Sequence, residues 1–99
     1  MSTREKVLKT ASGYITGPRQ EAYGPPEINF KKIASGWSEI FGIKITNSQV
    51  ALAMAWLKIA RMSHDHAVKD FEGFMDSGVD CAGYMALSVE LAEKEKPGN

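Results

Sequence analysis

Asp76, Asp80 and Tyr84 follow one another at intervals of four residues, in a segment whose apolar residues recur with the spacing of a helix. Side chains four apart lie on one face of a helix, so two carboxylates and a phenol are expected side by side. Two carboxylates one turn apart can bind a hard divalent cation such as Mg²⁺. The alternative is a pair of solvated acids beside an apolar stripe, which amphipathic helices often carry.

Lys58 and Arg61 form a second candidate pair, one turn apart on a segment with little other charge. A lysine offers phosphate a point charge and an arginine offers it a planar fork, so the pair predicts phosphate binding. If the two helices are antiparallel neighbours, these cations lie near Asp76 and Asp80. A structural network of the two cations and the two acids predicts the same proximity, so both interpretations stay open on the sequence.

Three further features have weaker chemical signatures. The stretch from Tyr23 to Pro26 is either a simple turn or an aromatic platform on which a nucleobase stacks. His64 and His66 do not match a zinc-binding spacing and are interpreted as solvated loop residues. Cys81 is the single cysteine and lacks the partner residues of a cysteine hydrolase signature, so it is expected to be a small core or interface residue.

Length and charge limit the classes of partner. The chain has 99 residues, enough for one domain with a small core. Its 12 basic and 12 acidic residues argue against a nucleic-acid or anionic-membrane surface, which needs a basic excess. One cysteine allows no internal disulfide, as in a reducing compartment. No apolar run is long enough to span a membrane, and the chain starts without the apolar core of a signal peptide, so the expected location is the cytoplasm.

The chemistry must be positioned by helices, because helical periodicity recurs along the chain and no strand pattern occurs. Capping boxes at Ser2–Glu5 and Thr46–Gln49 mark two helix starts. Helices are expected at about residues 3–15, 27–41, 47–62 and 68–94, with a polar break at Ser63–His66 and a solvated tail at 95–99. The predicted fold is a single all-α domain, a four-helix bundle.

The helix at 47–62 is apolar around most of its circumference, which is typical of a helix buried on several sides. A domain this small buries only part of its surface, so we expect another subunit to cover one face of this helix. Trp56 or its neighbours are expected in that interface, and Trp37 in the core or an interface. A homodimer or tetramer is therefore predicted.

The order of several short motifs resembles a family of small bacteriophage and prophage proteins. These motifs are Tyr23-Gly24-Pro-Pro-Glu27-Ile-Asn29-Phe30, then Ile33-Ala34-x-x-Trp37, then Val50-Ala51 with Lys58-Ile-Ala-Arg61, and then Asp76-x-x-x-Asp80-x-x-Gly83-Tyr84. They span roughly residues 20–90. That family in turn is similar to the all-α nucleoside triphosphate pyrophosphatases of the MazG-like superfamily.

The resemblance to the MazG-like enzymes implies a helical bundle that dimerises or tetramerises and holds Mg²⁺ with acids. It also implies hydrolysis of a nucleotide to its monophosphate and pyrophosphate. By position, Asp76 and Asp80 match the acidic pair on the later helix of those enzymes. Lys58 and Arg61 match the cations that would hold phosphate.

One departure from the MazG-like pattern concerns the preceding acidic helix. Those enzymes carry a Glu-x-x-Glu pair there, whereas this chain offers only Glu27, Asn29 and Glu39. A neutral asparagine is a weaker ligand for Mg²⁺ than a carboxylate, so a site with one metal, or nucleotide binding without hydrolysis, is expected instead of the usual two-metal site.

Two classes of function follow. The first is a phage-encoded nucleotide pyrophosphohydrolase in which Glu27 joins the acidic pair as a Mg²⁺ ligand, while Tyr23, Asn29 or Tyr84 contacts the base or the sugar. The second is a non-catalytic binding protein that sequesters a nucleotide signal of the host's defence or inhibits a host protein. The small number of acids favours the second class, and the acids, cations and tyrosines together favour a phosphate ligand in both.

Overall fold

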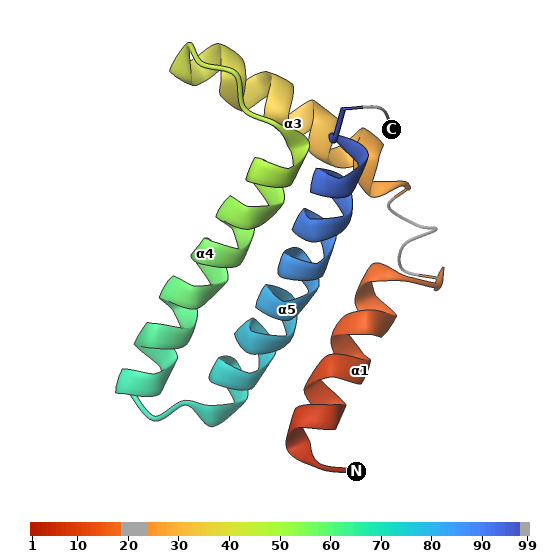
Figure 1. Cartoon of the computed structure of the whole chain (residues 1–99). Helices are drawn as coiled ribbons and strands as arrows, with labels where there is room; N and C mark the ends of the chain where they lie inside the picture. Colours follow the sequence, from red (N-terminus) through yellow and green to blue (C-terminus); the bar gives the residue numbers. More distant parts are fainter. Residues whose placement is uncertain (19–23, 98–99) are drawn as a thin grey trace.

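The structure is a computed structural model that describes residues 1–18 and 24–97. Within these residues it has four helices, namely α1 (Thr3–Ile15), α3 (Pro26–Phe41), α4 (Asn47–Ala67) and α5 (Phe71–Lys94), and no strand (Figure 1). The all-α fold class is therefore confirmed. None of these helices combines the length and apolar character that a membrane crossing requires.

An antiparallel hairpin of α4 and α5 makes the most extensive contact in the molecule. Its turn is short, and Lys69 adopts a left-handed conformation there with φ 60°. Asp70 then caps α5, because its Oδ1 accepts a hydrogen bond from Gly73 N at 3.0 Å. This hairpin brings the segment of Lys58 and Arg61 beside the segment of Asp76 and Asp80, as the sequence predicted for antiparallel neighbours.

The predicted polar break at Ser63–His66 is wrong, because α4 continues to Ala67. The backbone N–H of Val68 still donates to the carbonyl of His64, at 3.1 Å. Polar residues are tolerated in these last turns because they are largely solvated, and basic side chains suit the negative end of the helix dipole. The histidines therefore lie on a helix and not in a loop.

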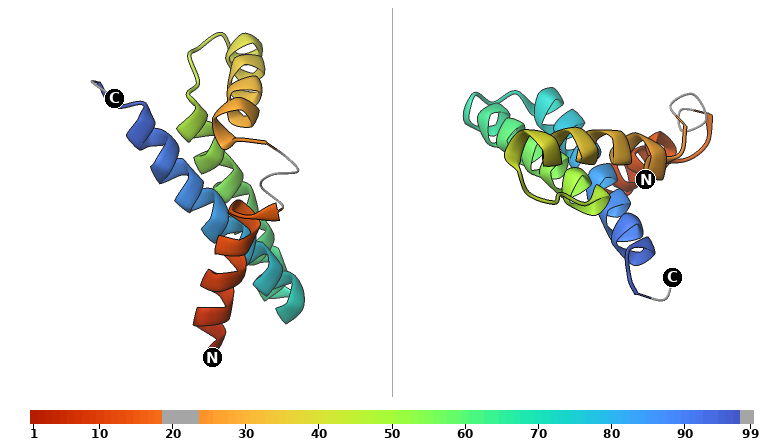
Figure 2. Two further views of the ribbon diagram at one scale, coloured as in Figure 1. Left: turned by 90° about the vertical axis from the view of Figure 1, so that its right-hand side faces the viewer. Right: turned by 90° about the horizontal axis from the view of Figure 1, so that it is seen from above.

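The other two helices attach to this hairpin in different ways. Helix α1 packs along α5, whereas α3 lies across the end of the hairpin, near the start of α4 and the end of α5 (Figures 1 and 2). The far part of α3 extends away from the other helices. The helices thus do not all run side by side.

The core lies where α3 meets the end of the hairpin. Its buried residues are one large aromatic and four smaller apolar residues, namely Phe30, Ala34, Val50, Ala51 and Leu91. Half-buried neighbours complete it, namely Trp37, Ile45, Met54, Tyr84 and Leu87. Only part of the predicted apolar stripe of α3 is covered, because Ile33, Ile40 and Phe41 remain exposed.

Side-chain caps fix the ends of the helices. Both predicted capping boxes are present, at Ser2 with Glu5 and at Thr46 with Gln49. Glu95, which the sequence placed in a solvated tail, instead accepts two hydrogen bonds at the start of α4, from Ser48 N at 3.0 Å and from Ser48 Oγ at 2.6 Å. The carboxylate thereby satisfies an N–H that the helix itself leaves without a partner. The end of α5 is thus tied to the beginning of α4.

Candidate functional site

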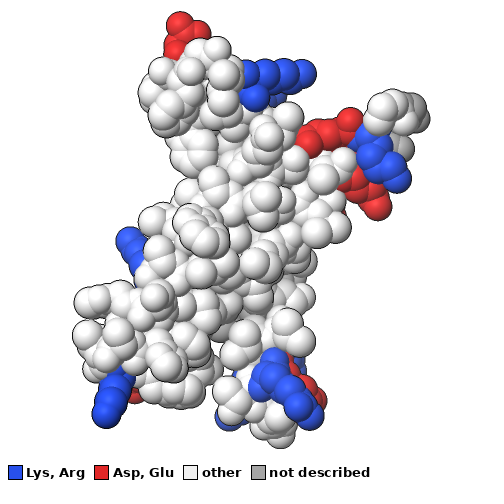
Figure 3. All heavy atoms as spheres, turned by 60° about the vertical axis from the view of Figure 1, so that its left-hand side comes forward, with Lys and Arg blue, Asp and Glu red and all other residues white. Residues whose placement is uncertain are grey.

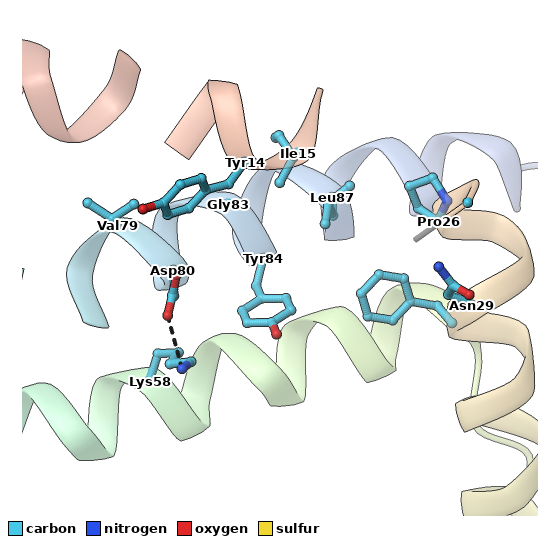
Figure 4. Close-up of a pocket in the computed structure, with 12 residues that line it drawn as sticks. Tyr14, Ile15, Pro26, Asn29, Lys58, Val79, Asp80, Gly83, Tyr84 and Leu87 are labelled. Atoms are coloured by element: carbon cyan, nitrogen blue, oxygen red, sulfur yellow. Dashed lines mark ion pairs between the residues drawn. The ribbon is translucent and has the colours of Figure 1, made fainter. Parts of the chain in front are cut away.

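A pocket of about 420 Å³ opens where all four described helices converge (Figure 4). We call it the aromatic pocket, because it is lined by the rings of Tyr14 from α1, Phe30 from α3 and Tyr84 from α5. The rings of Phe30 and Tyr84 meet edge to face, with centroids 6.4 Å apart and an interplanar angle of 85°. Asn29 adds an amide to the wall. The pocket thus combines flat apolar surfaces with a side chain that can both donate and accept hydrogen bonds.

A second hollow of about 570 Å³ runs along the hairpin, and we call it the charged groove. Its polar wall comes from α4 through Lys58, Arg61, His64 and Asp65, and from α5 through Asp76, Ser77 and Asp80. Lys58 and Asp80 also line the aromatic pocket. The two hollows are therefore adjacent and share two charged residues.

An ion pair stands at the junction of the two hollows. Lys58 Nζ lies 3.0 Å from Asp80 Oδ2, and the two side chains are 15 % and 36 % exposed. Partial burial lets less water screen the pair than would screen one on an open surface, so the two charges hold each other more firmly. The sequence predicted such a contact if the cations and acids form a structural network. The pair also places the Lys58 ammonium where it can reach either hollow.

The structure brings most of the predicted site residues together. Asp76, Asp80, Lys58 and Arg61 share the charged groove, while Asn29 and Tyr84 line the aromatic pocket. Tyr23 lies outside the described residues.

Glu27 does not join this site. Its carboxylate forms an ion pair with Lys94 at the end of α5, and its backbone carbonyl accepts a hydrogen bond from Asn47 Nδ2 at 3.4 Å. Its side chain lines neither hollow. Of the three predicted Mg²⁺ ligands, only Asp76 and Asp80 therefore lie in one groove. Across residues 1–18 and 24–97, no cluster of three or more histidine, cysteine, aspartate or glutamate residues has an arrangement suited to a metal ion.

Sequence reasoning missed the part that α1 plays in the pocket. Tyr14 is not among the predicted site residues, yet its ring forms one wall. The close approach of α1 depends on Gly83, because a Cβ there would lie 3.2 Å from Ile15 Cγ2. A glycine inside a helix lowers helix propensity, so its place beside Tyr84 was a signal that another element packs closely there.

Packing accounts for two residues from which the sequence predicted no catalytic or metal-binding chemistry. The ring of His66 lies against that of Phe74, with centroids 5.6 Å apart. Cys81 is buried between the helices, and this burial raises the pKa of its thiol above the ordinary value of 9.0. A thiol with a raised pKa is a poor nucleophile, which agrees with the predicted structural role.

Comparison with known proteins identifies a family. The chain is 34 % identical over 94 residues to the Gene 55 protein of Mycobacterium phage L5, an alignment that covers 91 % of this chain and 56 % of the phage protein. It is 35 % identical over 94 residues to the Gene 55 protein of Mycobacterium phage D29, which covers 95 % of this chain and 58 % of that protein. The chain thus spans a little over half the length of these relatives.

The predicted resemblance to a bacteriophage family is confirmed by these two relatives. No solved structure matches the chain. One protein-family model matches residues 6–92 of the chain. The matched segment includes each of the four helices in whole or in part. The chain therefore belongs to the family described as a domain of unknown function, DUF6378.

Proposed function

We propose that this chain binds a nucleotide, with the base in the aromatic pocket and the phosphates in the charged groove. The observation that carries the proposal is the adjacency of the two hollows through Lys58. A nucleotide has a flat aromatic end and an anionic end, and the molecule offers complementary surfaces side by side. Four of the residues that the resemblance to nucleotide pyrophosphatases singles out line the charged groove, namely Lys58, Arg61, Asp76 and Asp80.

The aromatic pocket has the physical properties that a nucleobase requires. Stacking of a base on an aromatic side chain contributes about 1–3 kcal/mol and does not depend strongly on which base is present. Ligand pockets are mostly apolar and contain a few polar groups that fix orientation. Tyr14 and Tyr84 provide the rings, and Asn29 provides an amide for the edge of the base.

The charged groove supplies the cations for phosphate. Arg61 lines it and forms no ion pair with any residue that the structure describes. Lys58 is held by Asp80, so it must exchange this carboxylate for a phosphate oxygen when a nucleotide binds. The exchange keeps one charge-assisted contact for the lysine and leaves the Asp80 carboxylate available to another cation.

That other cation is Mg²⁺ in the catalytic form of the proposal. Mg²⁺ is usually held by one or two carboxylates together with the phosphates of its substrate, so the carboxylates of α5 in the groove fit an ion that arrives with the nucleotide. Asp76 and Asp80 would hold it. Bound there, Mg²⁺ would neutralise charge that develops as pyrophosphate leaves. Lys58 and Arg61 would orient the phosphates beside it.

The non-catalytic form is favoured by a separate observation. Glu27 is engaged by Lys94, and the acids that line the groove, Asp65, Asp76 and Asp80, are not arranged as a metal-binding cluster in the part of the chain that the structure describes. A chain with this site would bind and retain a nucleotide signal. Both forms share the same ligand, and they differ only in what is recovered after incubation.

Calorimetric titration with a panel of ribonucleoside and deoxyribonucleoside triphosphates and cyclic nucleotides, each with Mg²⁺, tests the shared proposal. Arg61→Gln should weaken binding of a triphosphate at least tenfold and leave binding of the matching nucleoside unchanged. Tyr84→Leu should weaken both, because it removes the stacking surface. Lys32→Gln, on the exposed side of α3, is the control and should bind as the wild type does.

Chromatography of the same mixtures separates the two forms. Release of monophosphate and pyrophosphate, lost in Asp76→Asn and Asp80→Asn, supports the hydrolase. Recovery of intact nucleotide supports sequestration. Failure of every nucleotide in the panel to bind, or equal weakening by Lys32→Gln and Arg61→Gln, would refute the nucleotide proposal.

A further inference from the structure

The chain exposes more surface than a compact protein of its mass. Its accessible surface is 7035 Å² for 10.9 kDa, whereas a folded monomer of this mass has about 5,600 Å². Its radius of gyration is 14.7 Å, against about 12.6 Å for a compact domain of the same length. The excess of roughly 1,400 Å² is surface that a compact monomer would have buried.

Part of the exposed surface is a set of large apolar side chains on the two helices of the hairpin. Helix α4 exposes Leu52 and Trp56, which are 56 % and 69 % exposed, and α5 exposes Met85 and Val89, at 44 % and 72 %. Each pair is one helical turn apart, so each forms a stripe along its own helix. We call these four residues the apolar face. In Figure 3, which looks toward α4, the centre of the molecule carries no charged side chain and the charges lie at the margins.

The apolar face points away from the candidate site. Trp56 and Lys58 are two residues apart on α4, and a separation of two places them on opposite sides of a helix. Val89 and Tyr84 are five residues apart on α5 and also diverge. Covering the apolar face would therefore leave the aromatic pocket and the charged groove open.

We infer that a second copy of this chain covers the apolar face, in an isologous dimer. A contact that buried the whole excess of both copies would cover roughly 2,800 Å², which lies in the range of obligate homodimer interfaces. In a two-fold contact the same patch meets itself, so a charged patch would oppose like charges, whereas an uncharged one does not. The chain's net charge of zero adds no long-range repulsion between copies.

Light scattering after gel filtration tests the assembly directly. The wild type at tens of micromolar should have twice the mass of the 10.9-kDa chain. Leu52→Glu with Val89→Glu should reduce the mass to that of one chain, because two carboxylates per copy would be buried against their own counterparts. Leu8→Glu is the control, since Leu8 is 65 % exposed on α1 and lies outside the apolar face. It should leave the dimer intact.

A charge-swap experiment shows whether the face contacts itself. The double glutamate variant and the corresponding double lysine variant should each be monomeric alone and should form a dimer when mixed. Circular dichroism of each variant checks that its helices are retained. A mixture that stays monomeric while both variants remain helical would overturn the inference.

Quenching of tryptophan fluorescence needs no variant of the face and so remains informative if the double variants fail to fold. In a Trp37→Phe background, Trp56 is the sole tryptophan. It should be shielded from acrylamide at tens of micromolar and become several-fold more accessible on dilution to nanomolar concentrations. A wild-type mass of one chain, together with a freely quenched Trp56 at every concentration, would show that no second copy covers the face.

Discussion

At the scale of single residues, the ion pair between Lys58 and Asp80 links the stability of the fold with the chemistry of the site. It joins the two helices of the hairpin and also holds the cation proposed for phosphate. Because Asp80 is 36 % exposed, the pair lies between an exposed contact, worth less than about 1 kcal/mol, and a buried one, whose disruption costs about 3–5 kcal/mol. Loss of one partner should therefore have a measurable but moderate effect.

Asp80→Asn should lower the free energy of unfolding by roughly 1–3 kcal/mol, because it leaves a largely buried ammonium without its carboxylate. Lys58→Met keeps the apolar stem and removes the charge. The double variant should be more stable than the sum of the two single changes predicts, since the stranded charge is absent. Urea denaturation of the four proteins measures this coupling, and additive effects would mean that the pair contributes nothing.

Cys81 provides a prediction that depends on pH. Burial raises its pKa above 9.0, so the folded chain retains the proton at a pH where the unfolded chain loses it. The stability due to the protonated thiol is fully present below about pH 9 and is lost as the pH rises through the folded pKa. The free energy of unfolding should fall more steeply above pH 9 in the wild type than in Cys81→Ala. Alkylation by iodoacetamide should be slow until urea unfolds the chain, and equal rates in both states would contradict the burial.

At the scale of the elements, the helix ends are fixed by short-range contacts and one long-range contact. Glu95 caps α4 from the other end of the sequence through its two hydrogen bonds to Ser48. Glu95→Ala should destabilise the fold by about 1 kcal/mol, because a helix N-terminus loses an anion that bonds its N–H. Glu90→Ala removes an exposed acid within α5 and should change stability by less than about 0.5 kcal/mol. Equal denaturation midpoints for the two variants would contradict the cap.

Two glycine-to-alanine substitutions, one inside α3 and one at its end, should change the stability of the fold in opposite directions. Gly36 lies inside the helix, and a Cβ there would meet nothing within 4 Å, so Gly36→Ala should stabilise the fold by about 0.5–1 kcal/mol. Gly42 ends the helix with φ 69°, where its N–H bonds the carbonyl of Ser38. Gly42→Ala should destabilise by about 1 kcal/mol, because a side chain is strained in that conformation. Thermal melts of both variants should show shifts in opposite directions.

The sequence predicts the helices well where local signals act alone. Capping boxes depend on residues three apart, and both form as expected. The error at Ser63–His66 arose because polar residues resemble a loop when their exposure in the last turns of a helix is unknown. The acids and cations were placed together correctly because an antiparallel hairpin follows from a short connection.

The rest of the site depends on contacts that no local pattern encodes. Tyr14 enters the pocket only because α1 approaches Gly83. Glu27 is removed from the predicted metal site by Lys94, which lies far from it in the sequence. Helical spacing alone could not predict which residues long-range packing would bring into the site and which it would keep out of it.

At the scale of the whole molecule, the core is small and the exposed area is large. The largest fully buried side chains are Leu91 and Val50, so a single chain has little interior to stabilise it. If a second copy supplies the missing burial, stability depends on concentration by mass action. The melting temperature of the wild type should rise by several degrees between about 1 and 100 μM, whereas the double glutamate variant of the apolar face should melt at a temperature independent of concentration.

The short turn between α4 and α5 has a kinetic consequence. Contacts between neighbouring segments form with little loss of chain entropy, so the hairpin can assemble early and rapidly. The attachment of α1 and the crossing of α3 involve longer separations along the chain and are expected to follow. If pairing of two hairpins then completes the burial, the last step of folding is an encounter between chains. Its rate is set by how often they meet, so a newly made chain would reach its final state sooner where its own copies are abundant.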